Sequence, residues 1–207
     1  MAYALHRPGN FFKEENMKRV FLVAVLVMVL APAAWAQVPF VPSFEFGLAA
    51  GLNMPLGDMG DGMNNGYNFN ASVGYNVIPM LVIGAEFGVF GNGGTDETIA
   101  ALGPNGDFSM TSMQFAAMTK YMVPVAVHNL YAKGLAGAYR TSSSVKSVLG
   151  DFEVSDTNFG FGLGGGFQFK GGGNAAVYAE GMYHRISGEA ADAEFAMFNF
   201  GMLFSFN

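Results

Sequence analysis

The stretch FGFGLGGGFQF, residues 159–169, alternates bulky apolar side chains with glycine. The bulky side chains are Phe159, Phe161, Leu163, Phe167 and Phe169, and most of the intervening positions are glycine, at Gly160, Gly162, Gly164 and Gly166. Successive side chains of a β-strand point to opposite faces. The alternation therefore predicts a strand with one bulky face and one nearly empty face.

The same stretch spells G-x-G-x-x-G at Gly160, Gly162 and Gly165. A dinucleotide-binding turn needs these glycines between a strand and a helix whose N-terminus faces the pyrophosphate. Here the alternation runs through the glycines and ends in Lys170-Gly-Gly-Gly-Asn174, without a helical pattern. We therefore interpret the glycines as room for long side chains of neighbouring strands, and expect no cofactor.

Seven further segments share the period of two. In Phe44–Met54 and in Tyr67–Val77, one alternate set of positions is mostly large and apolar, while the other is mostly small or polar. The eight predicted strands are Phe44–Met54, Tyr67–Val77, Met80–Phe90, Met110–Tyr121, Leu130–Tyr139, Asn158–Phe169, Ala175–His184 and Met197–Phe206. The phase of Leu130–Tyr139 is taken from Lys133 alone.

The connections between these strands alternate in length. The long, polar connections are Pro55–Gly66, Gly91–Asp107, Arg140–Asp156 and Ser187–Glu194; the short ones are Asn76–Met80, Met122–Asn129 and Lys170–Asn174. Long loops at one end and short turns at the other are typical of an up-and-down barrel. The pattern predicts an all-β, eight-stranded antiparallel up-and-down barrel with no helical segment and no second domain.

Side-chain volume and charge indicate which face is outside. The interior of an eight-stranded barrel is just wide enough for side chains, so the bulky columns of every strand would overfill it. The charges within the predicted strands, Glu45, Glu86, Lys120, Lys133 and Glu180, all fall on the small, polar face. A basic residue on the lipid face at mid-bilayer costs about 2–4 kcal/mol. We therefore predict a transmembrane barrel with its bulky face in lipid.

The N-terminal segment indicates export. Lys18 and Arg19 precede an apolar run, and Ala34-Trp35-Ala36 follows it. This order predicts a signal peptide at residues 17–36, cleaved between Ala36 and Gln37. A membrane anchor is the alternative, but the run is shorter than the roughly 20 residues that span a bilayer. We interpret residues 1–16 as a misassigned start or an N-terminal extension, and residues 37–207 as the barrel domain.

The charge and cysteine content exclude several classes of protein. Residues 1–36 hold four of the 10 bases and two of the 16 acids, so the remaining chain has a net charge of −8. Such a chain has no electrostatic footprint for nucleic acid. With no cysteine, disulfides and thiolate metal sites are impossible.

Two stretches carry a resemblance to a known family. They are MQFAAMTKYMVPVAVHNLYAKGLAGAYR, Met113 to Arg140, and the aromatic closing strand FNFGMLFSFN, which ends in Asn207. The chain resembles the small eight-stranded outer-membrane barrels, the OmpA/OmpX-like group often labelled porin family. The resemblance covers residues 37–207 and implies no catalytic residues. In that family the last residue is usually aromatic and serves as an assembly signal, whereas here Asn207 follows Phe206.

The five strand charges are the candidate site. We expect Glu45, Glu86, Lys120, Lys133 and Glu180 to form a paired, structural network in the lumen, because buried charges need partners. The alternative is a gate or a narrow porin-like channel for small solutes. We expect neither a catalytic nor a metal site. A membrane-edge lipid-modifying enzyme, built on His184, Arg185, Ser187 and Glu189, is the less favoured alternative.

The predicted setting is the outer membrane of a Gram-negative bacterium. We expect a monomer with a structural or surface-interaction role, in envelope integrity or adhesion. Its expected partners are outer-membrane lipid and lipopolysaccharide, with periplasmic chaperones and the barrel-assembly machinery during biogenesis. Aromatic residues near strand ends are predicted to form girdles at the lipid–water boundaries: Phe44, Tyr67, Tyr121, Tyr139, Tyr183 and Phe206.

Overall fold

The computed structural model describes residues 42–147, 150–171, 173–188 and 192–206, which belong to one compact unit. Residues 1–16, the predicted signal peptide at residues 17–36 and its cleavage site lie outside the described residues, as does Glu189. Among the described residues, no helix has the length and hydropathy needed to span a bilayer.

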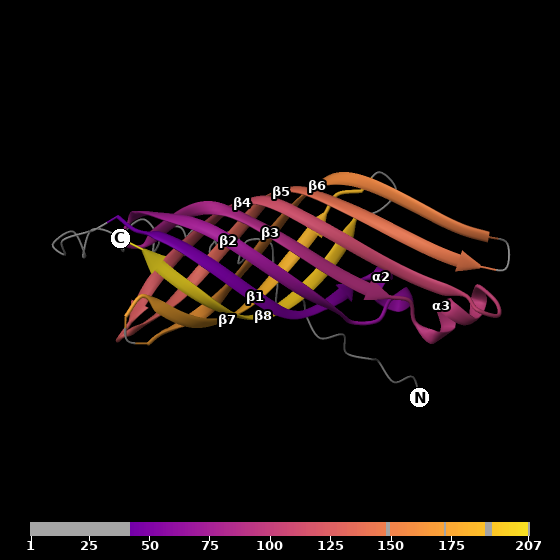
Figure 1. Cartoon of the computed structure of the whole chain (residues 1–207), viewed down its shortest axis with the longest axis horizontal. Helices are drawn as coiled ribbons and strands as arrows, with labels where there is room; N and C mark the ends of the chain where they lie inside the picture. The colour runs from indigo at the N-terminus through magenta and orange to yellow at the C-terminus, as the bar shows by residue number, and fades with distance from the viewer. Residues whose placement is uncertain (1–41, 148–149, 172, 189–191, 207) are drawn as a thin grey trace, which may run out of the picture. The chain divides into compact units, whose positions relative to one another are not determined.

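Eight antiparallel strands form a closed barrel, in which each strand pairs with its sequence neighbour and β1 pairs with β8 (Figure 1). The strands are β1 (Phe44–Leu56), β2 (Gly66–Ile78), β3 (Leu81–Gly93), β4 (Asp107–Val125), β5 (His128–Ser147), β6 (Gly150–Lys170), β7 (Ala175–Ile186) and β8 (Ala193–Phe206). The predicted fold class is therefore confirmed. Each strand follows a stretch of period-two alternation, and closure leaves no sheet edge along the barrel wall.

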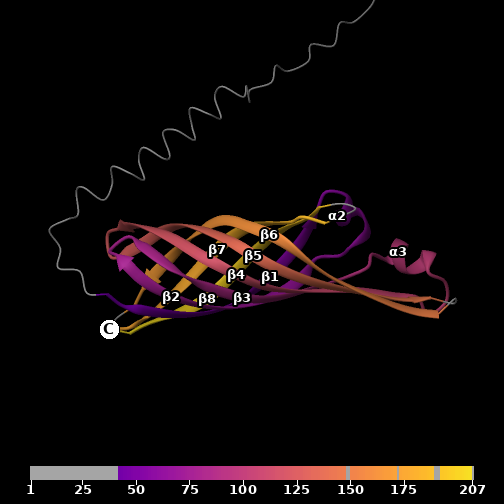
Figure 2. The same cartoon turned by 90° about the horizontal axis from the view of Figure 1, so that it is seen from above.

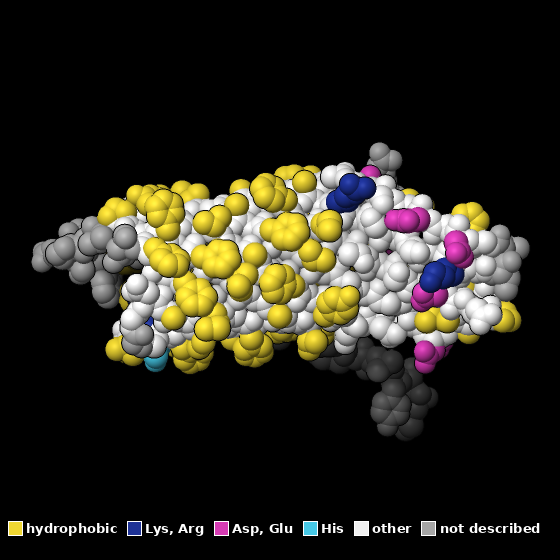
Figure 3. Space-filling model, viewed as in Figure 1, with side chains coloured by type: hydrophobic (Ala, Val, Ile, Leu, Met, Phe, Trp, Pro, Cys, Tyr) yellow, Lys and Arg dark blue, Asp and Glu magenta, His cyan; other side chains and the backbone are white. Residues whose placement is uncertain are grey.

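The wall of the barrel is apolar on its outside. Phe115, Phe200 and Tyr67 are 68%, 73% and 72% exposed, and they belong to the bulky columns of their strands. Apolar side chains cover much of the visible wall, and charged ones gather toward the end where α3 lies (Figures 1 and 3). The bulky columns thus face outward as predicted, which a lipid surrounding requires.

Strands β4, β5 and β6 are much longer than the others, at 19, 20 and 21 residues. A tilted membrane strand needs about 9–11 residues, so these strands extend past the wall (Figure 2). The predicted loop Arg140–Asp156 is therefore wrong, because the β5–β6 register is unbroken from Arg140 to Ser147. Residues 140–147 read RTSSSVKS, so this half of the hairpin lacks the bulky outward column that marks the wall. We call residues 107–112, 141–147 and 150–156 the protruding sheet.

Two short helices lie in the long connections, so the expectation of no helical segment is also wrong. They are α2 (Asp58–Gly62), between β1 and β2, and α3 (Asp96–Ala101), between β3 and β4. Thr95 caps α3 by accepting a hydrogen bond from the Thr98 N–H, and two acids stand in its first turn. Helices of five or six residues are too short to give a visible period in the sequence.

The glycines of β6 lie against long interior side chains, as predicted. A Cβ atom built on Gly166 would lie 2.5 Å from Tyr131 Oη, and one on Gly162 would lie 3.1 Å from the His184 ring. A dinucleotide-binding turn is not needed to explain these glycines, because β6 continues on both sides of them without a turn. The glycine column makes the room that neighbouring side chains fill.

Candidate functional site

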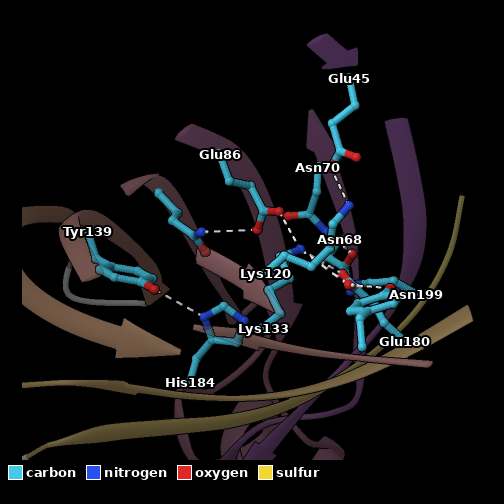
Figure 4. Close-up of polar contacts among 12 residues, drawn as sticks. Glu45, Asn68, Asn70, Glu86, Lys120, Lys133, Tyr139, Glu180, His184 and Asn199 are labelled. Atoms are coloured by element: carbon cyan, nitrogen blue, oxygen red, sulfur yellow. Dashed lines mark hydrogen bonds and ion pairs between the residues drawn. The ribbon is translucent and has the colours of Figure 1, made fainter. Parts of the chain in front are cut away.

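All five predicted strand charges lie inside the barrel, where each is 4–6% exposed. Lys120 pairs with Glu45. Lys133 lies between two carboxylates, with its Nζ 2.5 Å from Glu86 Oε2 and 3.1 Å from Glu180 Oε1 (Figure 4). Glu86 comes from β3 and Glu180 from β7, so Lys133 on β5 bridges strands that are not its neighbours.

Neutral side chains complete the network. Tyr131 Oη donates to Glu180 Oε2 at 2.9 Å, and Asn199 Nδ2 donates to Glu180 Oε1 at 3.1 Å (Figure 4). Gln114 Nε2 donates to Glu86 Oε1 at 3.3 Å. Sequence reasoning did not name these three residues as part of the site, although all lie on interior positions of their strands. The sequence did carry a signal for them, because each is a polar residue at an alternate position whose side chain points into the barrel.

A ladder of asparagines lines the lumen beside these charges. Asn53 Nδ2 donates to Asn92 Oδ1 at 2.5 Å, and Asn70 Nδ2 donates to Asn68 Oδ1 at 2.9 Å. All four side chains are buried. An amide group can donate and accept at once, so these side chains pair with one another, although the Asn53 Oδ1 atom has no partner among the described residues.

An aromatic layer lies between the charges and the long connections. Tyr139, His184 and Phe90 follow the charged positions of their strands by four to six residues, and Phe195 precedes Asn199 by four on β8, which runs in the opposite direction; each of the four is at most 2% exposed. The Phe90 and Phe195 ring centroids are 5.4 Å apart. Tyr139 Oη and His184 Nδ1 are 3.1 Å apart and share a hydrogen bond (Figure 4). This layer closes the lumen above the charges with packed rings.

The girdle prediction was wrong for Tyr139, which is fully buried in that layer. Its parity with Lys133 on β5 places it inside, and position near the predicted strand end is a weaker signal than parity. Phe44, Tyr67 and Phe206 are exposed on the outer wall, at 58%, 72% and 56%.

A small cavity lies in the lumen beside the charge network. This cavity, of about 20 Å³, lies among Tyr131, Lys133, Tyr178 and Glu180. This is room for about one water molecule. Paired charges, amides and rings line the lumen around this cavity.

The residues of the enzyme alternative have separate environments. His184 is buried and bonds Tyr139, while Ser187 is exposed and its N–H donates to the Phe159 carbonyl. Arg185 stands on the outer surface, with Nη2 2.5 Å from Asp192 Oδ2. A hydroxyl nucleophile needs a base within hydrogen-bond reach, and the hydrogen bond recorded for His184 goes to Tyr139 instead. Glu189 lies outside the described residues.

Comparison with known proteins gives one family and several similar folds. The family model described as "Outer membrane protein beta-barrel domain" matches residues 21–206. No curated protein matches the chain in sequence.

Three solved structures illustrate the similarity of fold. Neisserial surface protein A (NspA) is 17% identical with a TM-score of 0.57, over 81% of this chain and 100% of that one. Ail, the attachment invasion locus protein of Yersinia pestis, is 20% identical with a TM-score of 0.51, over 80% and 97%. A major outer membrane protein from Thermus thermophilus is 10% identical with a TM-score of 0.52, over 81% and 100%.

Proposed function

The chain belongs to the outer membrane protein β-barrel family, and from this premise we propose that it is a structural protein of the outer membrane that makes surface contacts through the protruding sheet. Long connections of such barrels face the cell exterior. The protruding sheet continues the same end of the barrel as those connections. It is therefore the part of the chain that meets the surroundings of the cell.

The protruding sheet has two different faces. On the side that continues the lumen, Phe108, Val145 and Phe152 are cross-strand partners, and Val154 follows in the next row. Phe152 and Val154 are 59% and 68% exposed. Apolar side chains exposed outside the membrane are typical of a contact surface.

One edge of this sheet has no paired strand within the described residues, and this observation carries the proposal. β7 pairs with β6 from Gly160 onward, and the Phe159 carbonyl still accepts from the Ser187 N–H at 2.9 Å. Phe159 therefore turns its backbone polar groups away from β5. In antiparallel pairs these groups alternate in direction from residue to residue.

The alternation identifies which backbone groups are open. The residues whose backbone N–H and C=O groups point the same way as those of Phe159 are Asp151, Glu153, Ser155 and Thr157. The Thr157 N–H donates to Asp156 Oδ1 at 2.8 Å. Asp151, Glu153 and Ser155 face no strand among the described residues, and such an edge can accept an extended peptide as an added strand.

The charge of the edge selects the class of partner. Asp151, Glu153 and Asp156 are exposed acids on β6. An extended segment that alternates basic and apolar side chains complements both these acids and Phe152. The Ail structure contains the heparin analogue sucrose octasulfate; a polyanion of that kind is disfavoured at this acidic edge. The proposed contact is therefore with a cationic, extended peptide segment.

A labelled peptide of alternating valine and lysine tests this proposal on the refolded, full barrel. We expect it to bind the wild type, and Ser155→Pro to weaken binding about tenfold or more by removing an open N–H. Ser155→Ala keeps that N–H and should bind as the wild type does. Equal binding by all three proteins, or equal binding of an N-methylated peptide, contradicts strand addition.

The filled lumen supports a structural role over the narrow channel. Charges that are paired across non-neighbouring strands hold those strands together, and the cavity beside them has room for about one water molecule, which favours a plugged lumen. The separate environments of His184 and Ser187 likewise support a non-enzymatic role. Lipopolysaccharide that changed in mass after incubation with the refolded protein would contradict it.

The proposal includes biogenesis. We propose that residues 17–36 are removed between Ala36 and Gln37, and that periplasmic chaperones and the barrel-assembly machinery deliver a monomer to the outer membrane. The mass of the protein purified from outer membranes tests the cleavage, since a retained leader contradicts it. Light scattering in detergent tests the monomer.

A further inference from the structure

Two arginines stand on the outer surface near the end of the apolar wall, and their surroundings differ. Arg185 on β7 is neutralised: its Nε and Nη2 lie 3.0 and 2.5 Å from Asp192 Oδ2, and Glu194 Oε1 is 3.8 Å from its Nε. Arg140 on β5 is exposed and has no ion-pair partner in the part of the chain that the structure describes. One exposed guanidinium is thus available to an external anion.

Arg140 lies at the boundary between two kinds of surface. Its cross-strand partners on the outer face are Met113 and Thr157. The next row toward the barrel wall is Phe115, Ala138 and Phe159, whose two rings are 68% and 64% exposed.

The next row away from the wall carries hydroxyl groups. It consists of Thr111, Ser142 and Ser155, and the hydroxyls of Ser142 and Ser155 are 2.8 Å apart. An apolar row, a cation and a hydroxyl row follow one another along the same three strands. A phosphorylated glycolipid has the same order, with acyl chains in the apolar layer and phosphate-bearing sugars in the polar layer next to it.

We propose that Arg140, with Thr157 beside it and the hydroxyl row above, binds the phosphate-bearing headgroup of an outer-leaflet glycolipid of the lipid A type. A guanidinium matches a phosphate with two parallel hydrogen bonds. Its stem lies along apolar surface while its head reaches the headgroup layer. The site uses outward-facing side chains of β4, β5 and β6 and not the open backbone groups of the β6 edge, so it does not rest on the proposed peptide contact.

The test measures the affinity of the refolded full chain for three probes in detergent micelles: bisphosphorylated lipid A, its dephosphorylated form and inorganic phosphate. We expect the wild type to prefer phosphorylated over dephosphorylated lipid A. Arg140→Gln should lower the affinity for phosphorylated lipid A about tenfold to hundredfold, which is the effect of losing charged hydrogen bonds. Arg140→Lys should lose less affinity than Arg140→Gln, because lysine keeps the positive charge but lacks the planar guanidinium that forms two parallel hydrogen bonds.

Arg185→Gln is the matched control, because it removes an exterior arginine that is already neutralised by Asp192. We expect its lipid A affinity to equal that of the wild type. Circular dichroism of the same samples verifies that both variants keep the barrel. Equal losses in the two variants, no preference for the phosphorylated lipid, or competition by millimolar inorganic phosphate would overturn the proposed site.

Discussion

The ring of Tyr139 lies so close to Gly160 on the neighbouring strand that a Cβ atom at Gly160 would come within 2.7 Å of Tyr139 Cδ2. The same Cβ would lie 2.9 Å from the Arg185 carbonyl oxygen. Because Gly160 on β6 has no side chain, the Tyr139 ring of β5 has room to lie against it. Tyr139 in turn reaches His184, and the two form part of the layer that closes the lumen.

Gly160→Ala should destabilise the barrel by about 1–3 kcal/mol, the usual effect of overpacking an interior. Urea unfolding in detergent micelles measures the change. Gly181→Ala is the control, since its Cβ would lie 3.6 Å from the Phe198 ring, an ordinary contact on the outer face. Equal stabilities of the two variants would show that Gly160 has more room than the structure gives it.

Lys133→Met should lower the free energy of unfolding by about 3–5 kcal/mol, because it leaves Glu86 and Glu180 buried without their cation. Lys146→Met is the comparison, since Lys146 Nζ and Asp107 Oδ2 are 3.6 Å apart on the surface, with both side chains more than half exposed. We expect at most about 1 kcal/mol from it. Replacing Glu86 and Glu180 by Gln in the Lys133→Met background should recover stability, and a further loss there contradicts the network.

The wild-type protein should give no large, steady conductance in planar bilayers. The buried aromatic layer and charge network lie in the lumen, and an eight-stranded barrel has an interior only just wide enough for side chains. Phe90→Ala combined with Phe195→Ala removes two rings of that layer and should raise the frequency of brief openings. Steady wild-type currents comparable to those of wide porins would contradict a filled lumen.

The carboxyl of Asp192 should titrate below its ordinary range. Its hydrogen bond and charge interaction with Arg185 lower the pKa of Asp192. A lowered folded-state pKa means that the pair's contribution is present above the unfolded pKa and is lost as the pH falls through the folded value, below about pH 4. Carboxyl NMR measures the midpoint: Arg185→Gln should raise it, while Lys146→Gln should leave it unchanged. An unmoved midpoint in Arg185→Gln would contradict the pairing.

Individual residues show why some features of the site were predictable and others were not. Lys133 and Glu180 could be assigned to the interior, because side-chain parity is a local property of each strand. Their contact could not, since β5 and β7 are separated by β6 and meet only across the lumen. Tyr139 was misplaced because its position near the predicted strand end was weighed above its parity with Lys133, which turns its ring into the lumen.

The sequence by itself determined the number and order of the strands in the wall, the direction of each side chain, and the choice of apolar outside and small, polar inside. The strands and the directions of their side chains follow from the period of two in the sequence. The choice of faces follows from the limited volume inside an eight-stranded barrel. Both can be read from a single chain. Tertiary structure alone decided which cation meets which carboxylate, how far β5 and β6 continue beyond the wall, and which arginine is left free. Those outcomes depend on strand register and closure, which bring together residues far apart in the sequence.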